Sequence, residues 1–229
     1  MSRADELAAN LVAVEDRVNA ACAAARRNRD EITVVAVSKT WPAADVELLR
    51  DLGVGDFGEN RDGEAAGKAA VVPDVRWHFV GSVQTNKARS VASYADVVHS
   101  VDRPALVTAL SKGAVRAGRQ VDVLLQVSLD GVPGRGGAAP EDVSELAAQA
   151  AAAEGLRLCG VMAVAPLDAD PAVAFARLAT VADGVRRDHP TARTISAGMS
   201  ADLEAAVAAG ANVLRVGTAL FGTRPPLLR

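Results

Sequence analysis

The segment ITVVAVSKT, residues 32–40, decides the fold of this chain. Its first six residues are apolar or β-branched and do not alternate with strongly polar residues. That pattern is typical of a strand that is buried on both faces of a parallel sheet. The segment ends in Ser38-Lys39-Thr40, so a lysine follows the buried strand directly. We therefore predict the first strand of an α/β fold here, with Lys39 at its carboxyl end.

Seven similar runs follow along the chain, separated by stretches that are rich in alanine or amphipathic. Strands that alternate with helices predict a parallel sheet, and eight of them predict a single (β/α)8 barrel, a TIM barrel. The expected strands are residues 32–37, 54–57, 77–80, 96–99, 121–127, 156–162, 194–196 and 213–216. An open, doubly wound sheet is the alternative, because the number of strands is difficult to fix from sequence.

An extra helix is expected before the first strand. Residues 4–28 carry apolar side chains at helical spacing, from Leu7 to Cys22, and end in a basic turn followed by asparagine. With 229 residues the chain has an ordinary length for one α/β barrel. We therefore expect a single domain over residues 1–229.

Composition and charge exclude several classes of partner. The net charge is −3 and the 25 basic residues are dispersed, so no basic face for nucleic acid is expected. No apolar run approaches the roughly 20 residues that span a bilayer. The amino terminus runs into a charged amphipathic segment and not into the apolar core of a signal peptide. We expect a cytoplasmic protein that binds neither membrane nor nucleic acid.

In a TIM barrel the functional residues lie on the loops after the carboxyl ends of the strands. A lysine that emerges there from an apolar strand is expected to be partly desolvated. Desolvation lowers the pKa of an amine and leaves it free to attack an aldehyde. Taken alone, a lysine at this position is more often an ordinary surface lysine at a strand end.

The loops after the seventh and eighth strands have the composition of a phosphate site. Small residues at 196–200 and at Gly217-Thr218 allow backbone N–H groups to approach a phosphate. These two loops form the common phosphate site of TIM barrels. Ser200 can also be the N-cap of the helix that follows.

Arg215 lies within the last expected strand, where an arginine is costly to bury without a partner. It is either a member of a structural ion pair or a hydrogen-bond donor to the pyridine nitrogen of a cofactor.

Six segments together carry a family pattern: VAVSKT (35–40), FGEN (57–60), WHFVG (77–81), QTNK (84–87), GMS (198–200) and RVGTALFG (215–222). In these segments the chain resembles the pyridoxal phosphate homeostasis proteins. The segments occur in the same order as in that family and extend over nearly the whole chain. The resemblance implies that the chain folds as the barrel of the alanine racemase N-terminal domain, without a further domain attached to it. It also implies pyridoxal 5′-phosphate (PLP) as the cofactor, held as a Schiff base on Lys39.

The resemblance implies a role for several other residues. It places Ser200, Gly217 and Thr218 at the phosphate and Arg215 at the ring nitrogen. Met162 is expected to approach the ring from the sixth strand. The further cofactor-binding residues that it implies are Asn60, His78, Ser196, Gly198 and Met199. We expect His78 to line the pocket and not to transfer protons.

Two features bear on chemistry outside this set. The loop Asp130–Gly137 carries Arg135 where the family often has the lysine of a Lys-Ser-Gly triplet, which argues against a second covalent acceptor there. The loop is not a P-loop, because it does not end in Gly-Lys-Ser/Thr. The three histidines, His78, His99 and His189, are too dispersed along the chain to predict a metal site.

The expected function is that of a non-enzymatic carrier, which holds PLP and contributes to its intracellular homeostasis. PLP-dependent apoenzymes are candidate recipients, and the family resemblance suggests a monomer. The alternative is a PLP-dependent amino-acid racemase of low activity. The alanine racemase family takes its second proton acceptor, a tyrosine, from an added domain of a partner subunit. This chain stops soon after the eighth strand, and its only tyrosine, Tyr94, precedes the fourth strand.

A third possibility is a barrel of the class I aldolase type, in which the lysine attacks the substrate carbonyl without a cofactor. Arg215 and the complete set of family segments argue against it.

Overall fold

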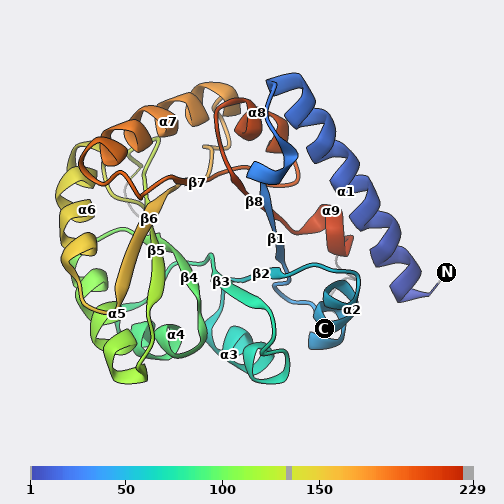
Figure 1. Cartoon of the computed structure of the whole chain (residues 1–229), viewed down its shortest axis with the longest axis horizontal. Helices are drawn as coiled ribbons and strands as arrows, with labels where there is room; N and C mark the ends of the chain where they lie inside the picture. Colours follow the sequence, from blue (N-terminus) through green and yellow to red (C-terminus); the bar gives the residue numbers. More distant parts are fainter. Residues whose placement is uncertain (1, 133–135, 224–229) are drawn as a thin grey trace.

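The computed structural model describes residues 2–132 and 136–223 of the chain. Eight parallel strands pair in chain order, and the sheet closes because β1 pairs with both β2 and β8. In Figure 1 the strands form the inner ring, and helices lie around it. The closed sheet confirms the predicted TIM barrel and shows that the alternative of an open sheet is wrong.

Each expected strand overlaps an observed one. The strands are β1 Thr33–Val37, β2 Asp56–Glu59, β3 Arg76–Phe79, β4 Val97–Val101, β5 Val121–Gln126, β6 Leu156–Met162, β7 Thr194–Ser196 and β8 Val213–Val216. The second strand begins two residues later than predicted. The N–H of Val54 donates to the carbonyl oxygen of Leu49 and closes the turn after the preceding helix, whereas the carbonyl oxygen of Gly55 accepts from the N–H of Arg76.

The outer layer is helical. Its helices are α1 Arg3–Ala25, α2 Ala43–Asp51, α3 Asp62–Val71, α4 Ala88–Tyr94, α5 Pro104–Ala117, α6 Val143–Ala152, α7 Pro171–Asp188, α8 Leu203–Ala208 and α9 Thr218–Phe221. Three short 3₁₀ turns are η1 Arg29–Glu31, η2 Thr85–Lys87 and η3 Pro140–Asp142. Within the described residues, no helix is both long enough and apolar enough to cross a membrane.

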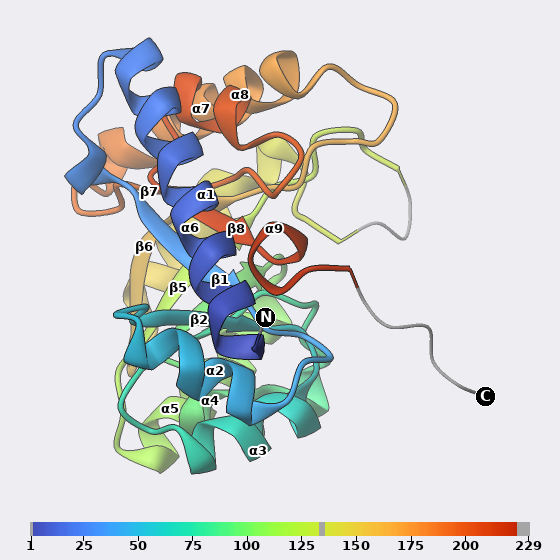
Figure 2. The ribbon, with the colours of Figure 1, turned by 90° about the vertical axis from the view of Figure 1, so that its right-hand side faces the viewer.

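The extra helix at the amino terminus is α1, as predicted. Ser2 and Asp5 form a capping box at its start, in which two otherwise unpaired backbone donors are satisfied. The helix ends three residues before the predicted end, because Arg26 adopts a left-handed conformation and its N–H bonds back to Ala23. Figure 2 shows α1 lying along the outside of the barrel, where it contacts α8 and α9.

The two faces of the sheet differ in polarity. Outward side chains such as Phe57 and Leu125 belong to the main apolar core, together with helix residues such as Phe175. Apolar residues inside the barrel form only a small cluster of Val97, Leu124 and Met162. Much of the interior is therefore filled by polar side chains, and these lead to the functional site.

Gly160 is required where β6 passes β7. Its φ of +151° is one that residues with a side chain rarely adopt, and a Cβ there would lie 1.9 Å from the carbonyl oxygen of Thr194. β6 also shifts register against β5 at this position, as strands do at a bulge.

We predict that Gly160→Ala lowers the free energy of unfolding by at least about 2 kcal/mol, because the backbone of β6 has to move away from β7. Gly67→Ala in α3 is the matched control, since its Cβ would meet no atom within 4 Å. That change should raise stability by about 0.5–1 kcal/mol, as helix propensity predicts. Denaturant unfolding of both variants measures the two effects. Equal stability of the Gly160→Ala variant and the wild type would contradict the assigned register.

Candidate functional site

A pocket of about 520 Å³ opens at the carboxyl ends of the strands. Its walls come from strand ends or from the loops that follow β1, β2, β3, β6, β7 and β8. Because parallel strands all point the same way, polar residues that are distant in the sequence gather at this mouth. The pocket is thus where the fold predicts a functional site.

Eight of the eleven predicted cofactor-binding residues line this pocket. They are Lys39, Asn60, Met162, Met199, Ser200, Arg215, Gly217 and Thr218. Sequence reasoning did not identify seven further lining residues, which are Val37, Val80, Gly81, Ser82, Gln126, Val164 and Ala201. Gly81 lies in the WHFVG segment, and a Cβ on it would lie 2.3 Å from the carbonyl oxygen of Asn60. The backbone of Asn60 therefore leaves no room for a side chain at position 81, which explains the glycine.

His78, Ser196 and Gly198 do not line the pocket, contrary to the expectation from the family pattern. His78 lies deeper in the barrel, because β3 continues to Phe79 and the pocket wall is formed by the residues after it. Ser196 is buried beneath the pocket, where it accepts a hydrogen bond from Arg215. Gly198 faces α8, and a Cβ on it would lie 2.6 Å from that of Ala206.

Lys39 projects from the end of β1 and is exposed. The partial desolvation predicted for it from sequence is therefore not found. The pocket is wide, so the strand end delivers the amine into an open space. The residue before Lys39 is nevertheless fully buried, so the two neighbours in sequence have opposite environments.

A buried ionic cluster holds the backbone on both sides of Lys39. The Nζ of Lys68 donates to the carbonyl oxygen of Ser38 at 2.8 Å, to Oε1 of Glu59 at 2.5 Å and to Oε1 of Glu64 at 3.0 Å. The Oγ of Ser38 donates to the same Glu59 oxygen at 2.7 Å. Since these contacts join β1, β2 and α3, the cluster fixes the strand end that carries Lys39.

The same cluster extends to Thr40, the residue after Lys39, and it includes Glu59, a carboxylate whose pKa is shifted by burial. The N–H of Thr40 donates to Oε1 of Glu64 at 2.5 Å, and Thr40 has a left-handed φ of 70°. Burial raises the pKa of Glu59, although hydrogen bonds from Lys68 and Ser38 act in the opposite direction. The signal for this cluster was present in the sequence, because Glu64 and Lys68 are four residues apart on a helix.

The loops after β7 and β8 bring several hydrogen-bond donors together. In the described part of the chain, the N–H groups of Ser200, Gly217 and Thr218 make no hydrogen bond to other residues. The Oγ of Ser200 accepts from the N–H of Ala219 at 3.2 Å, which ties the two loops together. Ser200 is not the N-cap of α8, because that position is occupied by Asp202. This set of donors fits a phosphate group.

Arg215 is buried in the barrel wall of the pocket. Its Nη1 donates to Oγ of Ser196 at 2.6 Å and its Nη2 donates to the carbonyl oxygen of Ala163 at 2.8 Å. Burial lowers the pKa of Arg215 to about 10, with Asp202 acting in the opposite direction. Arg215 forms no ion pair with any residue in the described ranges, so the alternative of a structural ion pair is wrong.

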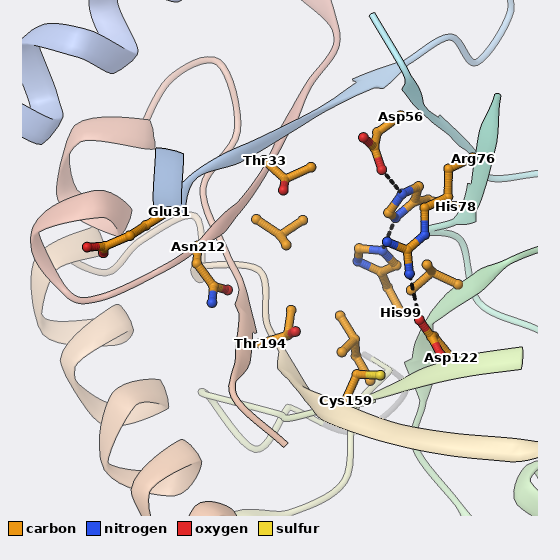
Figure 3. Close-up of a pocket in the computed structure, with 13 residues that line it drawn as sticks. Glu31, Thr33, Asp56, Arg76, His78, His99, Asp122, Cys159, Thr194 and Asn212 are labelled. Atoms are coloured by element: carbon orange, nitrogen blue, oxygen red, sulfur yellow. Dashed lines mark hydrogen bonds and ion pairs between the residues drawn. The ribbon is translucent and has the colours of Figure 1, made fainter. Parts of the chain in front are cut away.

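A second cavity, of about 170 Å³, lies at the amino ends of the strands (Figure 3). Asp56, His78 and His99 line it, and the two histidines are only 2.8 Å apart, from Nδ1 to Nε2. His78 and His99 lie far apart along the chain but meet here, because β3 and β4 are neighbours in the barrel. No group of three metal-ligating side chains occurs among the described residues.

Two residues singled out from the sequence lie away from the pocket. Tyr94 ends α4 in the outer layer, and its hydroxyl donates to Oδ1 of Asp62 at 3.3 Å. It does not contribute to the pocket wall. Arg135 lies outside the described residues, so the structure does not place it. Its neighbour Gly136 accepts a hydrogen bond from Nε2 of Gln126, which lines the pocket.

The chain is similar to known proteins over nearly its whole length. The family model "Alanine racemase, N-terminal domain" matches residues 9–225. The pyridoxal phosphate homeostasis protein of Mycobacterium tuberculosis is 43% identical, with 97% of this chain and 94% of the relative covered. The relative of the same name in Escherichia coli K12 is 36% identical, with 96% and 97% covered.

Solved structures agree with these sequence matches. PipY of Synechococcus elongatus, determined with PLP bound, is 36% identical with a TM-score of 0.79, and 90% of this chain and 100% of PipY are covered. The six segments quoted from the sequence, the barrel and the full-length similarity to the curated relatives agree with one another. The chain belongs to the family of pyridoxal phosphate homeostasis proteins, whose barrel is that of the alanine racemase N-terminal domain.

Proposed function

We propose that this protein binds PLP as a Schiff base on Lys39 and acts as a carrier in intracellular PLP homeostasis, without efficient catalysis of its own. One observation supports this most strongly. A single pocket brings together an exposed amine, a group of unpaired backbone donors and a buried guanidinium. These are partners for the aldehyde, the phosphate and the ring nitrogen of PLP, and the related PipY was determined with PLP bound.

Each group has a distinct role in this proposal. The amine of Lys39 condenses with the PLP aldehyde, so that a C=N bond forms and water leaves. The N–H groups of Ser200, Gly217 and Thr218 bind the phosphate. Bound PLP supplies an electron-accepting ring, and Arg215 donates a hydrogen bond to its nitrogen. Because a guanidinium stays protonated, it disfavours protonation of that nitrogen and leaves the ring a weak electron acceptor.

The composition of the pocket favours a carrier over a racemase. Two-base racemisation needs one proton acceptor on each face of the substrate. Lys39 and Arg215 are the only ionisable side chains among the described residues that line the pocket. Since arginine does not accept a proton near neutral pH, Lys39 is left as a single base. A racemase of low activity is the second candidate, and the alanine racemase barrel of the family favours it.

The proposal extends to how the protein works in the cell. The barrel accounts for nearly the whole chain, which supports a single domain over residues 1–229. The pocket is open and Lys39 is exposed, which suits exchange of PLP with another protein. We propose a cytoplasmic monomer that delivers PLP to PLP-dependent apoenzymes.

The covalent site can be tested directly because the chain has only four lysines. Borohydride reduction of PLP-loaded protein, followed by mass mapping, should place PLP on Lys39. The Lys39→Ala variant should lose the visible colour and still fold, because the side chain is exposed. Lys112→Ala on α5 removes another exposed lysine and should keep the colour. PLP found on Lys68, Lys87 or Lys112 would contradict the assignment.

The absence of a second base predicts slow racemisation. PLP-loaded protein should convert L-alanine or L-serine to the D-form about 10²–10⁴-fold more slowly than a two-base racemase, because a missing general acid or base has that effect. Chiral chromatography of the products measures the rate, and Lys39→Ala should abolish any turnover. Racemisation at ordinary enzymatic rates, about 1–10³ s⁻¹, would instead make this protein an enzyme.

A further inference from the structure

Five polar side chains form one continuous chain of hydrogen bonds through the barrel interior. Nη1 of Arg215 donates to Oγ of Ser196 at 2.6 Å, and Oγ of Ser196 is 2.9 Å from Nδ1 of His99. Nε2 of His99 is 2.8 Å from Nδ1 of His78, and Nε2 of His78 is 2.8 Å from Oδ1 of Asp56. Figure 3 shows the half of this chain that reaches the second cavity. The chain links that cavity to the wall of the PLP pocket.

When both histidines are neutral, the carboxylate of Asp56 and the guanidinium of Arg215 determine the direction of every hydrogen bond between them. The carboxylate of Asp56 can only accept, so Nε2 of His78 carries a proton. The Nδ1 of a neutral His78 must then accept from Nε2–H of His99. The Nδ1 of a neutral His99 must in turn accept from the hydroxyl of Ser196. That hydroxyl oxygen is left to accept from Arg215, which can only donate. The carboxylate of Asp56 and the guanidinium of Arg215 therefore require the same order of donors and acceptors. No hydrogen bond in the chain has a donor facing another donor.

Burial keeps the chain in this form. His99 and Ser196 are fully buried, and His78 and Arg215 are nearly so. Burial above all, with the positive charge of Arg215 acting in the same direction, holds the pKa of His99 well below its usual range, so that His99 is neutral. Arg76 and Asp122 also face the cavity, but they bond to each other and not to the histidines.

The hydrogen-bond chain also strengthens the contact between Arg215 and Ser196. A hydroxyl that donates its own proton becomes a better acceptor, because linked hydrogen bonds polarise one another. Ser196 is the only side chain in the described residues that accepts from Arg215. The strength of this contact therefore depends on the histidines behind it, and through them on Asp56.

We propose that Asp56, His78, His99 and Ser196 are positioning residues that orient Arg215 and couple its hydrogen bond with the PLP ring nitrogen to the charge of Asp56. This inference rests on the proposed function. It assigns a role in the PLP site to a carboxylate at the opposite end of the barrel.

The test compares two variants with a matched control. Asp56→Asn keeps the shape but removes the charge that orders the chain, and Ser196→Ala removes the link next to Arg215. Glu31→Gln also removes one negative charge from the wall of the same cavity, but Glu31 is not part of the chain. Ser196→Thr restores the hydroxyl. Circular dichroism establishes that each variant is folded.

PLP affinity and the visible spectrum give the first readout. Ser196→Ala should weaken PLP binding about tenfold and shift the absorption maximum, because a charge-assisted hydrogen bond is lost. Asp56→Asn should weaken binding about threefold with a spectral shift in the same direction, since one neutral hydrogen bond is weakened and not removed. Glu31→Gln should match the wild type, and Ser196→Thr should recover most of the loss.

Nitrogen NMR of the histidine side chains in the PLP-free protein gives the second readout. His78 and His99 should both carry their proton on Nε2, and Asp56→Asn should abolish this single pattern. His189, the third histidine, is the internal reference. Unchanged spectra and affinity in both Asp56→Asn and Ser196→Ala would overturn the proposal. A wild-type protein that takes up no PLP would overturn the proposed function and the coupling with it, while the NMR pattern would persist.

Discussion

The buried guanidinium of Arg215 is the constraint on which the arrangement of the site depends. A charged group inside a barrel is costly unless hydrogen bonds satisfy it. Here Ser196 and the carbonyl of Ala163 satisfy it from below. The interior beneath the pocket therefore needs polar side chains beside its small apolar cluster, and these continue as far as Asp56. The main apolar core of the protein lies between the sheet and the helices.

The same fold solves a different problem at Lys39. An amine that reacts with an aldehyde has to be accessible, while the backbone that carries it must not move. The exposed side chain of Lys39 meets the first requirement. The cluster of Glu59, Glu64 and Lys68 meets the second, because it holds the backbone in place. The cluster bonds to residues on either side of Lys39 and leaves Lys39 itself free to point into the pocket. Precision at the site therefore comes from groups that do not line it.

The features predicted from the sequence are those set by local pattern. The run at 32–37 identified β1 and thus Lys39, and the small residues after β7 and β8 identified the loops with unpaired donors. The contacts that were missed join residues that are distant along the chain. His78 and His99 are 21 residues apart, and only closure of the barrel places them in contact. Depth inside the barrel was also not predictable, because a family pattern shows that His78 is present but not which layer it occupies.

The most direct test of the account is a crystal structure of the protein with PLP. The account predicts a covalent link from Nζ of Lys39 to PLP, with the phosphate at the N–H groups of Ser200, Gly217 and Thr218. It also predicts the ring nitrogen within hydrogen-bond distance of Arg215, with the bond from Arg215 to Ser196 retained. PLP bound to another lysine, or a ring nitrogen turned away from Arg215, would contradict it.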